Sequence, residues 1–392
     1  MWHRVVSRGV LHNLLICVPR ITQASSSPNE YLLTTFDSWV QDDWKVLRRL
    51  TVNLGLRYEP WLPPHDGRGY MAGFLPGVQS MIAPLAPKGV LFGGDPGIPQ
   101  AIASNSWDTF SPRFGFAWDI FGSGKTILRG GYGVFRSGTE FFGLVSTLAN
   151  SVPFRTVTVS IPSPASLENP YANYGPSPFP YTPPSSLAKY SFGSNIAIRV
   201  LNPQTRPGYT QSWNLTLDRQ LTHDTAITVS YVGNHVVGIM TRYQANPGVY
   251  GPGATAGNLN SRRIYPGIGN LTLAGSWGWS RYDGLQTQVV KRAAHGLTLL
   301  VNYTWAKAMG IDSSGAFATA LGAGPRDPYN LGLDYSPADY DITHSFKAAV
   351  IYDLPAIHGV TGDVPARRER VAGQFDSDGA DRISVHLPEW CG

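Results

Sequence analysis

Apolar and polar residues alternate strictly along several stretches of this chain, most clearly over 50–59. Every even-numbered residue from Leu50 to Tyr58 is apolar, whereas the odd-numbered residues include Asn53 and Arg57. Because successive side chains of a β-strand point to opposite faces, this pattern predicts a strand with one apolar and one polar face. Similar alternation predicts about nine strands: 36–45, 50–59, 111–120, 126–135, 209–220, 226–235, 283–292, 297–306 and 345–354.

The first eight of these strands form four hairpins with very unequal connections. Within each hairpin the strands are joined by four or five residues, but the segments between hairpins run to tens of residues. The segment 152–207 alone holds eleven prolines, which a sheet ladder does not accept. Short turns at one end and long loops at the other are typical of outer-membrane β-barrels. Strands of about ten residues also match a tilted crossing of a bilayer.

The sequence therefore predicts an all-β protein: a partial, antiparallel transmembrane β-barrel with long extracellular loops. Composition agrees, because charged residues make up 15% of the chain, below the roughly 25% usual in soluble proteins. Aromatic residues reach 12%, and no apolar run is long enough for a membrane helix. The net charge of +5 is scattered, without the basic stripe that binds nucleic acid, so no nucleic-acid partner is expected.

Several local motifs suggest chemistry but fit structural roles better. The segment GSGKT at 122–126 lacks the first glycine of a phosphate-binding loop, because that position is Asp119, and it joins two strands. A tight hairpin turn is the better interpretation. The nine histidines show no metal-binding spacing, and no calcium ligand set stands out in the loops. Cys17 and Cys391 are too far apart in sequence for a local metal or redox motif. We expect no enzyme activity, cofactor or metal.

Five segments carry a family resemblance. They read WVQDDWKVLRRLTVNLGLRYEPW, SPRFGFAWDIFGSGKTILRGGYGVF, PGYTQSWNLTLDRQL, YDGLQTQVVKRAAHGLTLLVNYTWAKAM and ADYDITHSFKAAVIYDLP. In this order they resemble the barrel of TonB-dependent outer-membrane receptors, particularly the Oar-like group. The resemblance implies a 22-strand barrel with an N-terminal plug, located in the cell outer membrane. It also implies uptake of a large or scarce solute, driven by the TonB complex.

The match is to part of such a receptor. The sequence predicts about nine strands. We expect no plug before Phe36, no convincing TonB-box segment and no aromatic-ended strand at the C-terminal end. The expected organisation is an N-terminal segment over 1–35 with weak signal-peptide character, a partial barrel over 36–355 and a polar tail over 356–392. Outer-membrane lipid and an unidentified solute are the expected partners, and the TonB complex is implied by the resemblance alone.

The polar faces of the strands are the candidate functional surface. In a transporter these faces would line the solute path or hold the plug. They could equally serve only to keep the interior of a barrel hydrated. The predicted lumen-facing residues are Asn53, Arg57, Arg113, Arg129, Asn214, Asp218, Gln286, Gln288 and Asn302. Four loop aromatic residues could stack on a carbohydrate or peptide, or pack within their own loop: Tyr171, Tyr174, Phe179 and Tyr181.

A second class of protein fits part of this pattern. Alternating strands also build soluble sandwiches, in which two apolar faces pack against each other. A soluble, extracellular β-rich adhesin or carbohydrate-binding protein is therefore the alternative to a membrane transporter. The long strands and their Gly-containing polar faces favour the barrel, because a wet lumen accepts such faces.

Overall fold

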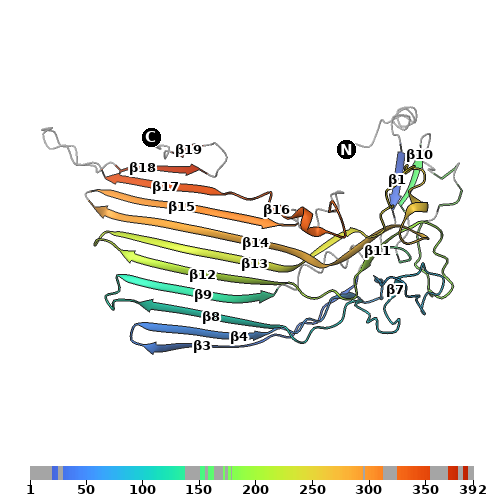
Figure 1. Ribbon diagram of the computed structural model, residues 1–392, viewed down its shortest axis with the longest axis horizontal. Coiled ribbons are helices and arrows are strands. Elements are labelled where there is room, and N and C mark those ends of the chain that lie inside the picture. Colours follow the sequence, from blue (N-terminus) through green and yellow to red (C-terminus); the bar gives the residue numbers. More distant parts are fainter. Residues whose placement is uncertain are drawn as a thin grey trace, which may run out of the picture.

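One antiparallel sheet dominates the computed structural model (Figure 1). The structure describes residues 20–24, 30–136, 151–154, 158–162, 171–172, 175–177, 179–294, 296–311, 325–353, 370–377 and 383–386. The main strands are β3 (Ser38–Leu47), β4 (Leu50–Tyr58), β8 (Phe110–Asp119), β9 (Thr126–Arg136), β12 (Tyr209–Gln220), β13 (Thr225–Gln244), β14 (Ile268–Ala294), β15 (Leu297–Gly310), β17 (His344–Asp353), β18 (Arg370–Ser377) and β19 (Ile383–His386).

Smaller elements lie between and before these strands. They are β1 (Arg20–Ala24), β2 (Tyr31–Leu32), β5 (His65–Asp66), β6 (Ala72–Phe74), β7 (Val90–Phe92), β10 (Thr158–Pro162), β11 (Ile196–Leu201), β16 (Ser336–Pro337) and the 3₁₀ turns η1 (Asn260–Arg262) and η3 (Leu331–Asp334). Among the described residues, no helix is long and apolar enough to cross a membrane.

The main strands are hydrogen-bonded in the order β19-β18-β17-β15-β14-β13-β12-β9-β8-β4-β3. All nine predicted strands are present, in antiparallel pairs between neighbours. Within the described strands, β3 and β19 end this path and do not pair with each other, so the sheet is open. The four predicted hairpin turns lie together at one end of the sheet, and the long connections lie at the other (Figure 1).

The prediction of nine strands was too low, because β18 and β19 extend the sheet. They fall within 356–392, where the sequence predicts a polar tail and no strand. The antiparallel register from Phe346–Ser377 to Asp353–Arg370 joins β18 to β17. Backbone pairing with a neighbouring strand edge needs no alternation of apolar side chains, and this explains why the pattern did not reveal them.

The GSGKT segment is a hairpin turn between β8 and β9, as predicted. Gly122 and Gly124 have φ of +73° and +69°, a region that side chains other than glycine rarely adopt. The Asp119 carboxylate accepts hydrogen bonds from both backbone N–H groups, at 2.9 and 2.8 Å. This residue, which breaks the phosphate-binding motif, thus stabilises the turn.

At the loop end, β13 and β14 run well beyond the predicted strands. β11 pairs with the extension of β14 in parallel, and the loops fold around both. This region holds the two clusters of buried apolar side chains in the described part of the chain. Phe92, Val200 and Leu271 are at most 1% exposed there. The Gly/Pro-rich segments therefore form a packed unit on the end of the sheet (Figure 1, right).

Asp95 is a buried anchor of this loop-end unit, with 3% exposure. Its carboxylate accepts hydrogen bonds from the backbone N–H groups of Met81 (2.7 Å), Ile82 (3.1 Å) and Phe92 (2.8 Å). The Ser80 hydroxyl donates a further bond at 2.8 Å. Burial by itself would raise the pKa of Asp95, but these donors together hold the pKa below its ordinary value.

Loop-end stability should consequently depend on pH. Because the folded-state pKa of Asp95 is lowered, its contribution is complete above the unfolded pKa of about 4 and is lost as the pH falls below it. We expect cleavage of the loop-end segments by pepsin to rise between pH 5 and pH 3. In the Asp95→Asn variant the rate of pepsin cleavage at pH 5 should be higher than in the wild-type protein. Its rise between pH 5 and pH 3 should be smaller. An equal pH response in both proteins would contradict this role.

Candidate functional site

The nine predicted lumen-facing residues share one face of the sheet. Residues directly opposite each other in neighbouring strands lie on the same face, so the register settles this point. One row joins Asn53 through Gly115 and Gly131 to Asn214. The adjacent row on the same face joins Arg129 through Thr216 and Ser230 to Gln286. Tracing the cross-strand pairs in the same way places the other five residues on this polar face: Arg57, Arg113, Asp218, Gln288 and Asn302.

Polar side chains on this face bind one another across the strands. The Arg129 guanidinium lies 2.6 Å from the Asp218 carboxylate, which also accepts a hydrogen bond from Thr228 at 2.8 Å. The Gln288 amide donates to Asn302 at 2.8 Å. Such pairs remain partly exposed, so the face is both ordered and wettable.

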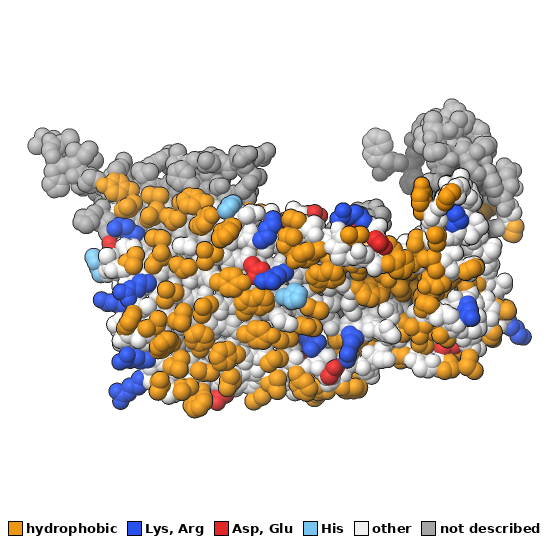
Figure 2. All heavy atoms as spheres, in the orientation of Figure 1, with side chains coloured by type: hydrophobic (Ala, Val, Ile, Leu, Met, Phe, Trp, Pro, Cys, Tyr) orange, Lys and Arg blue, Asp and Glu red, His pale blue; other side chains and the backbone are white. Residues whose placement is uncertain are grey.

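The opposite face carries the apolar half of the alternation. In the row that begins at Leu50, the next four strands contribute Trp118, Leu128, Leu217 and Val229. Large apolar side chains on this face are exposed, for example Leu54 at 49% and Trp305 at 55%. Figure 2 shows the resulting apolar surface over the strands, with Lys and Arg along its turn-end edge.

This apolar face forms a band that is slanted relative to the hydrogen-bonded rows. On β4 the band runs from Leu50 to Tyr58, and on β17 it runs from Tyr352 to Phe346. The row that starts at Leu50 meets β17 at Phe346, six residues short of Tyr352. The offset along the strand is six residues of about 3.3 Å each, and the distance across the sheet is seven strand spacings of about 4.8 Å each. The ratio of these two lengths corresponds to a slant of about 30°. Barrel strands tilt by a similar angle, so the band is horizontal when the strands are tilted.

Charged residues interrupt the apolar face at the loop end of the band. Following the cross-strand pairs from Leu54 on β4 leads to Asp283 on β14 and Lys307 on β15. Arg281 binds Asp283 at 2.6 Å, and Lys307 forms an ion pair with Asp341. Charge on a lipid-facing surface costs little near the interface and much at the midplane. These pairs therefore mark one boundary of the band.

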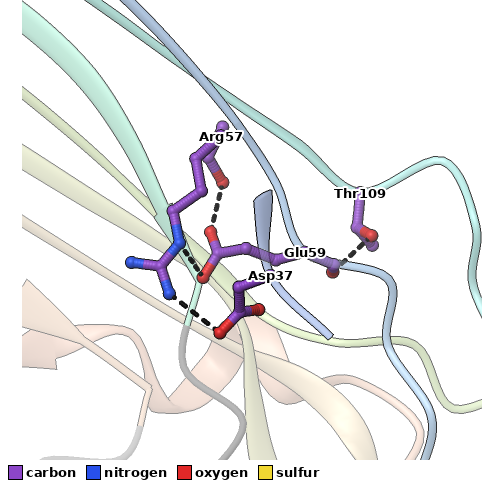
Figure 3. Close-up of polar contacts among 5 residues, drawn as sticks. Asp37, Arg57, Glu59 and Thr109 are labelled. Carbon is purple, nitrogen blue, oxygen red and sulfur yellow. Dashed lines mark hydrogen bonds and ion pairs between the residues drawn. The ribbon is translucent and has the colours of Figure 1, made fainter. Parts of the chain in front are cut away.

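A pocket of about 420 Å³ lies where the polar face meets the loop-end unit. Figure 3 shows its charged wall, in which Arg57 contacts Asp37 at 3.2 Å and Glu59 at 3.1 Å. Glu59 is held in turn: the Thr109 hydroxyl donates to its backbone carbonyl at 2.5 Å. The predicted residue Arg57 is thus paired with two carboxylates that the sequence pattern did not single out.

Arg136 lines the same pocket and differs from Arg57. β8 and β9 are paired only as far as Arg113 and Gly133, so Arg136 lies where the two strands part. Its guanidinium lies 5.4 Å from the centre of the Tyr209 ring. Within the described part of the chain, its Nε atom is buried without a hydrogen-bond partner. The Arg57 Nε also lacks a hydrogen bond of good geometry, but it lies 3.1 Å from the Glu59 carboxylate. Sequence reasoning missed this residue, because alternation places it on the apolar side of β9.

The loop aromatic residues are only partly described. The Tyr181 hydroxyl donates to the Pro153 carbonyl at 2.6 Å, which holds that residue within the loop unit. Tyr174 lies outside the described residues, as do Cys17 and Cys391. No group of three potential metal ligands occurs in the ranges that the structure describes.

Comparison with known proteins gives a family and a set of distant structural likenesses. Residues 13–379 match the family model described as outer membrane beta barrel domain. No curated protein is significantly similar to the chain. The outer-membrane transporter YddB of Escherichia coli is 10% identical, with a TM-score of 0.45 over 87% of this chain and 32% of that one.

Two further solved structures are similar at the same level. The alcaligin receptor FauA of Bordetella pertussis is 11% identical, with a TM-score of 0.38 over 90% of this chain and 38% of that one. The FrpB iron transporter of Neisseria meningitidis is 10% identical, with a TM-score of 0.42 over 87% and 32%. The chain spans about a third of the length of these proteins.

Proposed function

Because this chain belongs to the outer membrane beta barrel domain family, we propose that it forms the wall of a TonB-dependent receptor for a large or scarce solute. Membership places the protein in the cell outer membrane. The soluble adhesin predicted as an alternative does not fit, since the family is one of membrane barrels and the apolar band is exposed. We propose no catalytic step for the described surface.

The observation that carries the proposal is the division of the wall into two faces. The apolar band has the slant that a tilted barrel strand requires, and lipid would cover it. The polar face runs from the hairpin turns to the pocket beside Arg57 and would line the solute path. We propose that the nine lumen-facing residues keep this path hydrated and bind the solute weakly, so that the solute can be released.

We assign the first step of uptake, the capture of the solute, to the loop end of the sheet. In this proposal the packed loop-end unit captures the solute, and the solute then passes along the polar face. Energy would come from the TonB complex, as the family resemblance implies. The chain spans about a third of solved receptors, so the coupling to TonB is part of the proposal.

Entry of a large solute tests this function. The full chain, preceded by an outer-membrane export signal, is expressed in cells whose outer membrane excludes vancomycin. We expect the protein to raise vancomycin entry. A Gln286→Cys variant labelled with a bulky maleimide should reduce entry, whereas a labelled Leu285→Cys variant on the apolar face should not. Unchanged entry with the protein folded in the membrane would contradict the proposed function.

A further inference from the structure

The pocket beside Arg57 contains two arginines in unlike electrostatic states. Arg57 faces Asp37 and Glu59, at 3.2 and 3.1 Å, so its charge is compensated by the protein. Arg136 is half-buried on the same pocket wall, and the ion pairs of the described residues do not include it. Both carboxylates that line the pocket are already bound to Arg57. Arg136 therefore has no carboxylate within ion-pair distance among the described residues, although Glu59 and Asp108 attract its charge from farther away.

The position of Arg136 favours a planar, two-point contact. The Tyr209 ring, 5.4 Å from the guanidinium carbon, supports the guanidinium plane. A guanidinium held in this way presents paired N–H donors, which match the geometry of a carboxylate or a phosphate. Its Nε atom is buried and unsatisfied among the described residues, and such a donor costs free energy until it is bonded.

The rest of the pocket is largely apolar. Trp61, Leu62 and Pro207 line it together with the charged residues, and its volume of about 420 Å³ is within the range of small-molecule sites. An occupant with an apolar body and one oxyanion group fits this combination of surfaces. The oxyanion would bond the guanidinium of Arg136, because Arg136 is the one charged residue of the lining without an ion pair among the described residues.

We propose that this pocket binds an oxyanion group, a carboxylate or a phosphate, with Arg136 as the residue that holds it. Asp37 and Glu59 both bind Arg57 and bring the summed charge of the four charged pocket residues to zero, which confines the attraction to Arg136 and limits the affinity. The inference rests on the proposed uptake function only for the idea that the oxyanion belongs to the solute. Binding itself is a property of the pocket and is measured separately.

Equilibrium dialysis of the full-length protein in detergent, with radiolabelled citrate and inorganic phosphate at fixed ionic strength, tests the proposal. The two probes distinguish a carboxylate site from a phosphate site. We expect at least one probe to bind. Arg136→Gln should weaken that binding at least tenfold, and Arg136→Lys should weaken it less, because the charge remains but the paired donors are lost. Lys88→Gln removes an exposed cation that does not line the pocket and should leave binding unchanged.

A variant with the opposite expected effect guards against a folding artefact. Asp37→Asn removes one carboxylate from the pocket and releases part of the Arg57 charge, so binding should tighten. Equal affinity in wild-type protein and Arg136→Gln, or no binding of either probe to folded protein, would overturn the inference. Normal solute entry without oxyanion binding would overturn this inference alone. Oxyanion binding without solute entry would overturn the proposed function alone.

Discussion

Replacing Leu215 with arginine is expected to keep most of the protein from assembling in the membrane. Leu215 lies at the middle of the apolar band on β12 and is 48% exposed. Arginine on the lipid face of a barrel costs about 2–4 kcal/mol at the midplane. The fraction of protein that shows heat-modifiable migration in detergent gels measures assembly, and we expect that fraction to fall several-fold.

The neighbouring residue supplies the matched control. Asn214 lies next to Leu215 but on the polar face, where the register pairs it with Gly131. Asn214→Arg introduces the same side chain on the same strand and should leave assembly nearly unchanged. Equal assembly of the two variants, or a greater loss for Asn214→Arg, would show that the assignment of faces is wrong.

Replacing Asn246 with alanine is expected to loosen the loop-end unit while the sheet remains intact. Asn246 is fully buried; its side chain donates to the Tyr265 and Ile268 carbonyls, at 2.9 and 2.8 Å. It also accepts a hydrogen bond from the Tyr265 N–H at 2.8 Å. Alanine leaves these buried groups unpaired, at a cost of about 1–3 kcal/mol for each group that finds no water. Amide exchange around Leu271 should accelerate by about a hundredfold, equivalent to about 2.7 kcal/mol.

Two further variants separate this effect from a general loss of stability. Asn246→Asp retains an acceptor for Tyr265 but cannot donate to the two carbonyls, so exchange should again accelerate. Asn105→Ala changes an exposed asparagine of the same loop-end region and should have little effect. Exchange in the paired strands β4 and β12 should stay slow in every variant. Slow exchange around Leu271 in Asn246→Ala would contradict the role of Asn246.

The sheet was predictable from the sequence because each main strand shows its own two-residue period. Leu50–Tyr58 needs no information from distant residues to indicate a strand, and its hairpin with β3 follows from the four-residue connection. The shared face of Asn53 and Gln286 was predictable for the same reason: local alternation fixes the face within each strand, and pairing carries it to the neighbours.

What the sequence could not reveal depends on partners far away in the chain. The extension of β14 from Ile268 is rich in glycine and gives a weak pattern; it is ordered by β11 and the packed loops. The pocket has a similar origin, because Asp37, Arg57 and Arg136 come from three segments that strand pairing brings together. No local spacing relates these three residues, so a site of this kind requires the register of the whole sheet.

The two-faced wall is tested most directly by cysteine accessibility along β14. Cys17 and Cys391 are replaced by serine, and Gln288 and Val289 are replaced singly by cysteine in the full chain assembled in the outer membrane. We predict that a charged, membrane-impermeant maleimide labels Gln288→Cys and spares Val289→Cys, because water reaches the first side chain and lipid covers the second. Equal labelling of both, or labelling of Val289→Cys alone, would contradict the account.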